Sequence, residues 1–147
     1  MFKTAVLTFI IFIASHALYA QEWHTSFEEA KATAKAEGIN IVLVFQGSDW
    51  CAPCIKLDKE IWSTSTFQGL AKEHFVMLKA DFPRRKGNQL PEALAKQNAE
   101  LAERYNSQGY FPFVVVLNPS GKVLGQMGYE KSSPEAYFKK LKSFERP

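Results

Sequence analysis

The sequence predicts an α/β protein in which a central mixed sheet of four to five strands carries helices on both faces. Two apolar runs, "INIVLVF" and "HFVMLKADF", are separated by about thirty residues with helical spacing, which is typical of parallel strands joined by a right-handed crossover. A later stretch, "FVVVLNPSGKVLGQM", has two strand-like runs around a turn, which indicates an antiparallel hairpin.

The first twenty residues, "MFKTAVLTFIIFIASHALYA", are expected to be an export signal. Lys3 precedes an uncharged run from Ala5 to Ala14, about half of the ~20 residues that a membrane-spanning helix needs, so a permanent anchor is the weaker interpretation. Cleavage near Ala20 would leave residues 21–147 as one domain of common size in the periplasm or outside the cell.

Composition favours a soluble globular protein, with 46% apolar and 22% charged residues in a chain of 147. After loss of Lys3 the chain has 17 basic and 15 acidic residues, a formal charge of +2 that selects no partner. The only basic run is Arg84, Arg85 and Lys86, which is interpreted as a solvated loop and not as a nucleic-acid site. We expect a monomer.

The first half of the domain starts with a helix in "TSFEEAKATAKAEG", which Thr25 or Ser26 can cap and Gly38 can end. The strand Ile39–Phe45 is branched and almost wholly apolar, so we expect it to be central and covered on both faces. After a loop at 46–50, a helix is predicted from Cys51 to about Trp62, then a short one at 66–73 and a strand at 74–82.

The second half continues with a polar loop, "PRRKGNQLP", and a helix from Pro91 to Tyr105. Strands are predicted at 113–117 and 122–127, with a tight turn at 118–121 between them. Ser133 and Pro134 begin a last helix that runs to about Phe144.

Cys51 and Cys54 are the only cysteines, and a Cys-x-x-Cys pair has three physical uses. Structural zinc needs four ligands, and the domain offers only the unpaired His24 and His74 besides, which disfavours a metal site. A purely structural disulfide across two residues would close too small a loop to stabilise the fold much, although an exported protein can hold it oxidised.

Reversible redox chemistry explains the position of the pair as well as its spacing. The free N–H groups at a helix N-terminus stabilise a thiolate and can lower the pKa of a cysteine by one to several units from ~8.5. Cys51 is therefore the candidate nucleophile. Cys54, one turn further on the same side of the helix, is the candidate resolving cysteine.

These residues resemble the thioredoxin superfamily: "DWCAPC" follows a buried strand, and "YFPF" opens a hairpin before a final helix. The stretch "CAPCIKLDKEIWSTSTF" is most similar to exported thioredoxin-like proteins and to the C-terminal periplasmic domain of the membrane thiol:disulfide interchange protein. The resemblance implies the thioredoxin fold for residues 21–147. It also implies a cis peptide at Pro112, although a proline at a strand start could be in trans from sequence alone.

The resemblance further implies a substrate-binding role for four residues. The backbone of Phe111, beside Pro112, would pair with an extended substrate segment, because an open strand edge can bind a peptide by strand addition. Trp50 would shield one side of the cysteine pair. Pro53 would hold the first helical turn while removing one backbone donor.

One position departs from the family pattern. Many thioredoxins have a buried Asp six residues before the first cysteine, and this chain has Phe45 there. Proton transfer would then use water or another acid. Asp58, four residues after Cys54, is the candidate, with an exposed helix acid as the alternative, and Asp49 is weaker because it could instead cap the helix.

The predicted function is an exported thiol:disulfide oxidoreductase that needs no metal or organic cofactor. Its partners would be disulfide-bearing protein substrates and a membrane thiol-disulfide electron donor. Reduction of protein disulfides is favoured over oxidation, but the sequence does not determine the direction. The alternatives are a non-catalytic binding module of the same fold, or a redox chaperone with exposed Phe-rich patches.

Overall fold

A computed structural model describes residues 21–145, and the predicted leader and its cleavage site lie outside the described residues. The sheet has five strands in the order β1-β3-β2-β4-β5. Strand β2 pairs in parallel with β3 and antiparallel with β4, and β5 is antiparallel to β4, so the sheet is mixed as predicted. The strands are β1 (Trp23–His24), β2 (Asn40–Gln46), β3 (Phe75–Asp81), β4 (Phe113–Leu117) and β5 (Val123–Met127).

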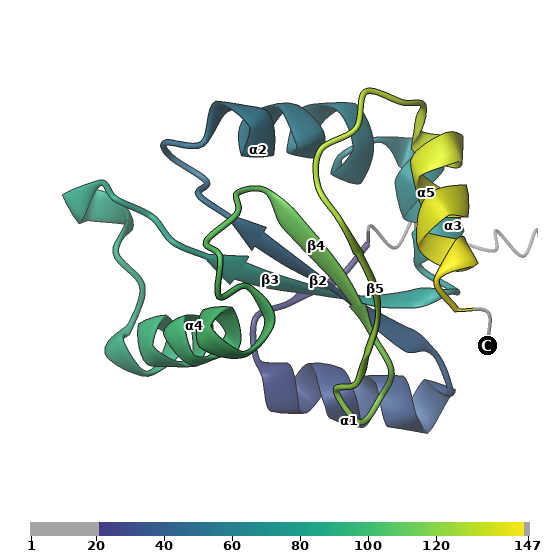
Figure 1. The fold of residues 1–147 in the computed structure, drawn as a ribbon, viewed down its shortest axis with the longest axis horizontal. Coiled ribbons are helices and arrows are strands. Elements are labelled where there is room, and N and C mark those ends of the chain that lie inside the picture. The colour runs from purple at the N-terminus through teal and green to yellow at the C-terminus, as the bar shows by residue number, and fades with distance from the viewer. Residues whose placement is uncertain (1–20, 146–147) are drawn as a thin grey trace, which may run out of the picture.

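Helices cover both faces of this sheet (Figure 1). Helices α1 and α4 lie on one face, and α2, η1, α3 and α5 lie on the other. The helices are α1 (Phe27–Glu37), α2 (Ala52–Leu57), the π-helix η1 (Asp58–Trp62), α3 (Ser65–Ala71), the 3₁₀ turn η2 (Lys86–Asn88), α4 (Glu92–Tyr105) and α5 (Pro134–Ser143).

Alternate side chains of the central strand β2 supply both cores, because successive residues of a strand point to opposite faces. Ile41, Leu43 and Phe45 pack under α1 and α4, and Val42 and Val44 pack under α2, η1, α3 and α5. All five are at most 1% exposed. Burial on both faces explains why this strand has no polar alternation in sequence.

Local signals place the helix ends. The Ser26 hydroxyl accepts a hydrogen bond from the Glu29 N–H at 3.3 Å, as a capping residue should. Gly38 ends α1 with φ of 68°, a left-handed conformation that glycine adopts without a steric cost. Pro91 stands at the cap of α4, so this helix begins one residue later than predicted.

Three elements differ from the sequence prediction. The 3₁₀ turn η2 lies within residues 83–91, which are predicted to be a polar loop. The edge strand β1 was not predicted, because two residues are too few to show a periodic pattern. The single helix predicted from Cys51 to Trp62 changes to a π-helical turn at Asp58, and the Ser63 N–H donates to the Asp58 carbonyl at 2.8 Å. The wider turn lets the consecutive residues Ile61 and Trp62 both enter the core.

The remaining element boundaries agree with the prediction to within about two residues. Within residues 21–145, none of the helices combines the length and the apolar character that crossing a membrane requires.

Candidate redox site

Cys51 and Cys54 form a disulfide at the start of α2. The chain enters this helix from β2 through a short loop (Figure 1). The Cα atoms of the two cysteines are 5.2 Å apart, and each residue is only 4% exposed. The bridge therefore lies just under the surface, and exposure does not distinguish the candidate nucleophile Cys51 from the candidate resolving residue Cys54 in this oxidised state.

The local sequence places Cys51 at the cap position of α2. Its backbone is extended, with φ of −91° and ψ of 97°, and its sulfur accepts a hydrogen bond from the Cys54 N–H at 3.3 Å. Pro53 lies in the first turn, where the missing N–H costs no helical hydrogen bond. A hydrogen bond from a backbone N–H is stronger to a charged acceptor, so the same contact would stabilise a Cys51 thiolate once the disulfide is reduced.

Trp50 forms one wall of the site and is held on three sides. Its indole N–H donates to the carbonyl of Phe82 at 2.7 Å, and its ring meets the ring of Phe111 edge-on with centroids 5.3 Å apart. The guanidinium of Arg84 lies over the other side, 3.6 Å from a ring centroid. The floor is Gly47, where a Cβ atom would lie 2.5 Å from Trp50 Cζ2.

The alternative capping role suggested for Asp49 is wrong, because Cys51 is the cap of α2. The Asp49 carboxylate accepts hydrogen bonds from the backbone N–H groups of Arg84 and Arg85, each at 2.9 Å, and from the side-chain amide of Asn88 at 3.0 Å. The hydrogen bond from Arg84 N–H, followed by that from Asn88, lowers the pKa of this carboxyl below its ordinary 3.8. Asp49 thus holds the loop 83–89 against the segment that leads into Cys51.

The peptide bond between Phe111 and Pro112 is cis, as the resemblance implied. Pro112 is buried, and the two residues line a hollow together with Pro53, Tyr110 and three others, Phe113, Gly128 and Tyr129. Among residues 21–145, no hydrogen bond uses the backbone N–H or carbonyl of Phe111. The chain therefore presents an unpaired backbone segment opposite the first turn of α2.

Asp58 is exposed on the helix that carries the cysteines, and its backbone N–H donates to the Cys54 carbonyl. Its carboxylate makes no hydrogen bond to another described residue. Phe45, at the position of the family's buried acid, is fully buried and lies among aromatic rings, with Phe82 at 6.5 Å and Phe113 at 6.4 Å between centroids. This core offers no proton acceptor at that position.

Tyr129, which lines the hollow beside Pro53 and Pro112, is held by an acid that the sequence analysis did not single out. The Tyr129 hydroxyl donates to the Glu60 carboxylate at 2.8 Å, and this joins the segment after β5 to the π-helix η1. Lys56 lies 3.9 Å from Glu60 and 5.5 Å from the centre of the Tyr129 ring. Because Tyr129 lines the same hollow as Pro53 and Pro112, this contact shapes the candidate substrate groove.

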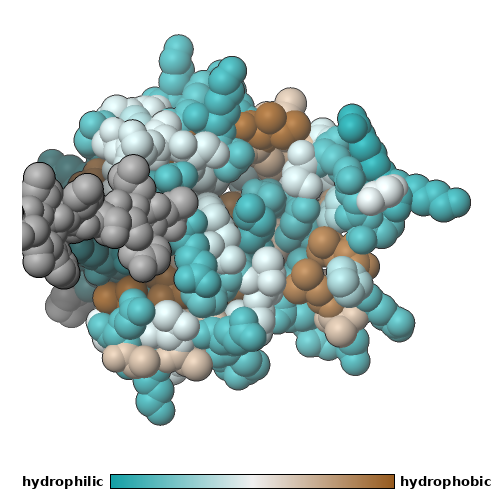
Figure 2. All heavy atoms as spheres, turned by 180° about the vertical axis from the view of Figure 1, so that it is seen from behind, coloured by the Kyte–Doolittle hydropathy of each residue, from teal (hydrophilic) through white to brown (hydrophobic). Residues whose placement is uncertain are grey.

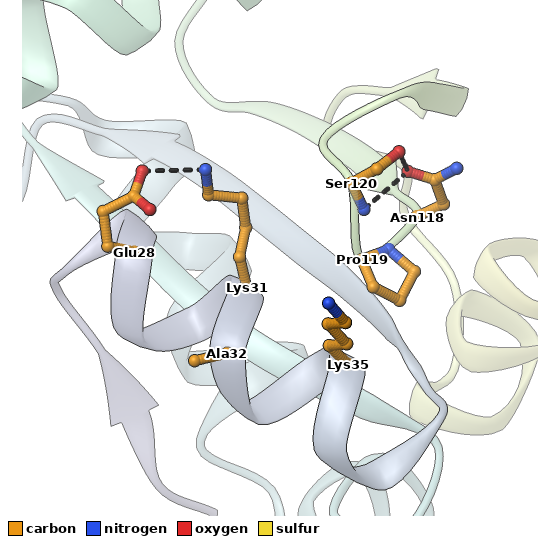
Figure 3. Close-up of a pocket in the computed structure, with 7 residues that line it drawn as sticks. All are labelled: Glu28, Lys31, Ala32, Lys35, Asn118, Pro119 and Ser120. Atoms are coloured by element: carbon orange, nitrogen blue, oxygen red, sulfur yellow. Dashed lines mark hydrogen bonds and ion pairs between the residues drawn. The ribbon is translucent and has the colours of Figure 1, made fainter.

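Another hollow lies between α1 and the turn that joins β4 to β5 (Figure 3). Of the residues that line it, Lys31 forms an ion pair with Glu28 at 2.7 Å, and the Asn118 side chain accepts hydrogen bonds from Ser120 within the turn. Helix α1 covers the face of the sheet opposite to α2, so this hollow is separate from the disulfide.

The arrangement of the sheet, the disulfide at the start of α2 and the cis proline define a protein of the thioredoxin fold. A family model described as Thioredoxin-like matches residues 22–119. The chain belongs to this thioredoxin-like family.

Three relatives illustrate the relationship. A "Disulfide bond reductase DsbH" of Chlamydia pneumoniae is 38% identical over 122 residues, which is 83% of this chain and 71% of that protein. A solved "DsbH Oxidoreductase" superposes with a TM-score of 0.79 at 34% identity, over 97% of this chain and 94% of that one. The oxidised C-terminal domain of DsbD from Neisseria meningitidis, at 17% identity and a TM-score of 0.54 over 78% of this chain and 89% of that one, shows the shared fold alone.

The residues that sequence reasoning missed come mainly from the segment after β3. A signal for them does exist, because β2 and β3 are parallel and Gln46 lies opposite Asp81 at their carboxyl ends. Loops that leave neighbouring parallel strands at the same edge meet in space. The loop after Asp81 was therefore predictable as a neighbour of the cysteine motif, but its individual contacts were not.

Proposed function

We propose that this protein is an exported thiol:disulfide oxidoreductase that reduces disulfides of protein substrates. The observation that carries the proposal is the Cys51–Cys54 bridge at the start of a helix, with the Cys54 N–H aimed at the Cys51 sulfur. The name of the Chlamydia pneumoniae relative, a disulfide bond reductase, supports the same direction.

The reaction begins with the reduced protein. The Cys51 thiolate attacks one sulfur of the substrate disulfide, a mixed disulfide forms, and the second substrate sulfur leaves as a thiolate that takes a proton from water. The Cys54 thiol then loses its proton and attacks the Cys51 sulfur. The first substrate sulfur leaves, so that the substrate has gained two electrons and two protons and the protein holds the disulfide.

Substrate binding would use the unpaired backbone of Phe111. An extended segment that pairs with Phe111 beside the cis proline would lie across the first turn of α2, in the hollow walled by Pro53 and Tyr129. Backbone pairing places few demands on substrate sequence, which suits a protein that acts on several disulfides. The ring of Trp50 would cover the other side of the mixed disulfide.

Proton removal from Cys54 would involve Asp58, since Phe45 leaves no acid beneath the sulfurs. The exposed Asp58 carboxylate reaches solvent, so it would act on Cys54 through a water molecule. An Asp58→Asn variant is expected to slow resolution of the mixed disulfide and to shift its pH profile. An unchanged pH profile would assign Asp58 to the exposed helix surface instead.

Turnover outside the cytoplasm requires an electron donor. A membrane protein with a reduced dithiol is the proposed partner, because thiol-disulfide exchange can regenerate the Cys51 and Cys54 thiols without a metal or organic cofactor. Export to the periplasm or beyond follows from the predicted leader, whose cleavage can be measured on the mature N-terminus.

The test is catalysed reduction of insulin by dithiothreitol, compared with a Cys51→Ala variant. We expect the wild-type protein to accelerate precipitation of the insulin B chain and the variant to have no effect. A reduction potential near −270 mV supports a reductase, and one near −120 mV would assign the protein to oxidation. Equal rates for the wild-type protein and the variant would refute catalysis.

The remaining alternatives make different predictions. A binding module would retain full partner binding in a Cys51→Ser, Cys54→Ser double variant. A redox chaperone would present exposed phenylalanines, but the large exposed apolar side chains among residues 21–145 are those of Ile55, Tyr110 and Val123. The face in Figure 2 likewise shows only small, separated apolar areas.

A further inference from the structure

We propose that the loop 83–89 is a recognition surface for acidic residues that flank the cysteine of the substrate. The proposal depends on the reductase function above and names the chemistry of the substrate at the same site. It assigns a role to Arg84, Arg85 and Lys86, which the sequence alone had suggested to be an ordinary solvated loop.

The loop is fastened to the cysteine motif. Asp49, two residues before Cys51, binds the backbone N–H groups of Arg84 and Arg85 and the amide of Asn88. Within the loop, the Gln89 amide donates to the carbonyls of Pro83 and Arg85 at 3.3 and 3.2 Å. The basic side chains therefore project from a fixed backbone, and ordering them on binding costs less than it would from a free loop.

Arg84 connects this loop directly to the redox site. Its guanidinium stacks on Trp50, and Trp50 immediately precedes the attacking cysteine. Arg84 and Trp50 also line one hollow, with Phe82, Pro83, Gly109 and Phe111 as its other walls. A substrate chain that pairs with Phe111 would thus pass the Arg84 guanidinium, which stacks on the residue next to Cys51.

The charges of the loop are available for a partner. Arg84, Arg85 and Lys86 are all exposed, and none forms an ion pair within the described part of the chain. Two acids next to the loop are engaged by hydrogen bonds. Asp49 accepts from the loop backbone and also attracts the Arg85 charge, and Asp81 accepts the Ser48 N–H at 2.9 Å and its hydroxyl at 2.6 Å.

The three basic side chains are therefore exposed, while the carboxylates of Asp49 and Asp81 are turned toward backbone and side-chain donors. In the view from behind, hydrophilic side chains project from the side of the molecule that carries this loop (Figure 2). Such an arrangement raises the association rate of segments of opposite charge more than it raises their affinity, and added salt weakens it.

The experiment uses reduced protein and three synthetic peptides, each with one cysteine held as a mixed disulfide with thionitrobenzoate. The residues around the cysteine are glutamates in one peptide, glutamines in the second and lysines in the third. Attack of the Cys51 thiolate on the peptide sulfur releases the coloured thionitrobenzoate anion, and Cys54 then releases the peptide thiol. The rate of colour release is measured at low and high salt.

We expect the glutamate peptide to react about tenfold faster than the lysine peptide at low salt, and the ratio to fall to about twofold at high salt. An Arg85→Gln, Lys86→Gln variant, which keeps the Arg84 stack, should lose most of this ratio. Its rate with the glutamine peptide should stay within about twofold of the wild type. Adding Arg84→Gln should bring the ratio close to one.

The matched control is a Lys35→Gln, Lys122→Gln, Lys139→Gln variant, which removes exposed lysines that have no ion pair among residues 21–145. It should keep the wild-type ratio. A wild-type ratio of one, or an equal loss in the control, would overturn the recognition role and leave the reductase function standing. No colour release from any peptide would instead refute the reductase function itself.

Discussion

Replacing Gly47 with alanine tests whether Trp50 is placed as described. Gly47 is buried at the end of β2, and its carbonyl accepts the N–H groups of Trp50 and Cys51 at 3.3 and 2.9 Å. Its φ is not in the left-handed region, so alanine meets no backbone strain there. The added methyl would nevertheless overlap the indole ring, with Trp50 Cζ2 at 2.5 Å and Cε2 and Nε1 closer still.

The expected loss in the free energy of unfolding follows from the contacts that the Trp50 ring loses when the added methyl displaces it. Moving the ring breaks the hydrogen bond from Trp50 Nε1 to the Phe82 carbonyl, worth about 1 kcal/mol. Overpacking a filled site adds about 1–3 kcal/mol, and alanine returns about 0.5 kcal/mol by restricting the unfolded chain. We therefore expect Gly47→Ala to lower the free energy of unfolding by about 2 kcal/mol, or Tm by about 7 °C.

The assay is urea unfolding of the oxidised protein, followed by circular dichroism. The control is Gly69→Ala in α3, where a Cβ would meet nothing within 4 Å, so alanine should stabilise the helix by about 0.5–1 kcal/mol. A Trp50→Ala background should abolish most of the Gly47→Ala cost. If Gly47→Ala is as stable as the wild type, or if its cost persists without the indole, the described packing is wrong.

Two further predictions concern the contacts around the site. Asp49→Ala should speed amide hydrogen exchange in the loop 83–89 at neutral pH. In the wild type the same faster exchange should appear as pH falls below 3.8. The folded state lowers the pKa of Asp49, so the stabilisation that its carboxylate provides is lost when the group is protonated. An unchanged exchange rate in the variant would contradict this. Glu60→Ala and Tyr129→Phe should show a coupling of about 1 kcal/mol in a double-mutant cycle of unfolding, and additive effects would exclude the hydrogen bond as a stabilising contact.

The sequence could predict most of the fold because its signals are local. The apolar run of β2, the cap at Thr25 or Ser26 and the glycine at position 38 each specify structure over a few residues. The structure confirms the strand and the glycine and assigns the cap to Ser26. The edge strand β1 and the π-helical turn could not be predicted in this way. Each depends on pairing or packing with residues far along the chain.

The candidate site likewise combines features with a local sequence signal and features that depend on distant residues. The spacing of Cys51 and Cys54 and the resemblance at Pro112 indicated the centre of the site, since each of these features is a short motif of consecutive residues. The hydrogen bonds that the Asp49 carboxylate accepts span 35 to 39 residues, and the one that the Glu60 carboxylate accepts spans 69. Neither partner carries a pattern that distinguishes it from an ordinary surface acid before the fold is known.

The pairing of β2 with β3 gives the site two separable parts. Gln46 and Asp81 lie opposite each other, so the loop that carries the cysteines and the loop that carries the basic residues leave the sheet side by side. In the proposed reaction the first loop determines the sulfur chemistry through its helix start. The second loop contacts the first through Trp50 and Asp49, and Asp81 at the end of β3 holds Ser48. Substitutions at Arg85 and Lys86 can therefore change which segments are drawn to the site without moving either sulfur.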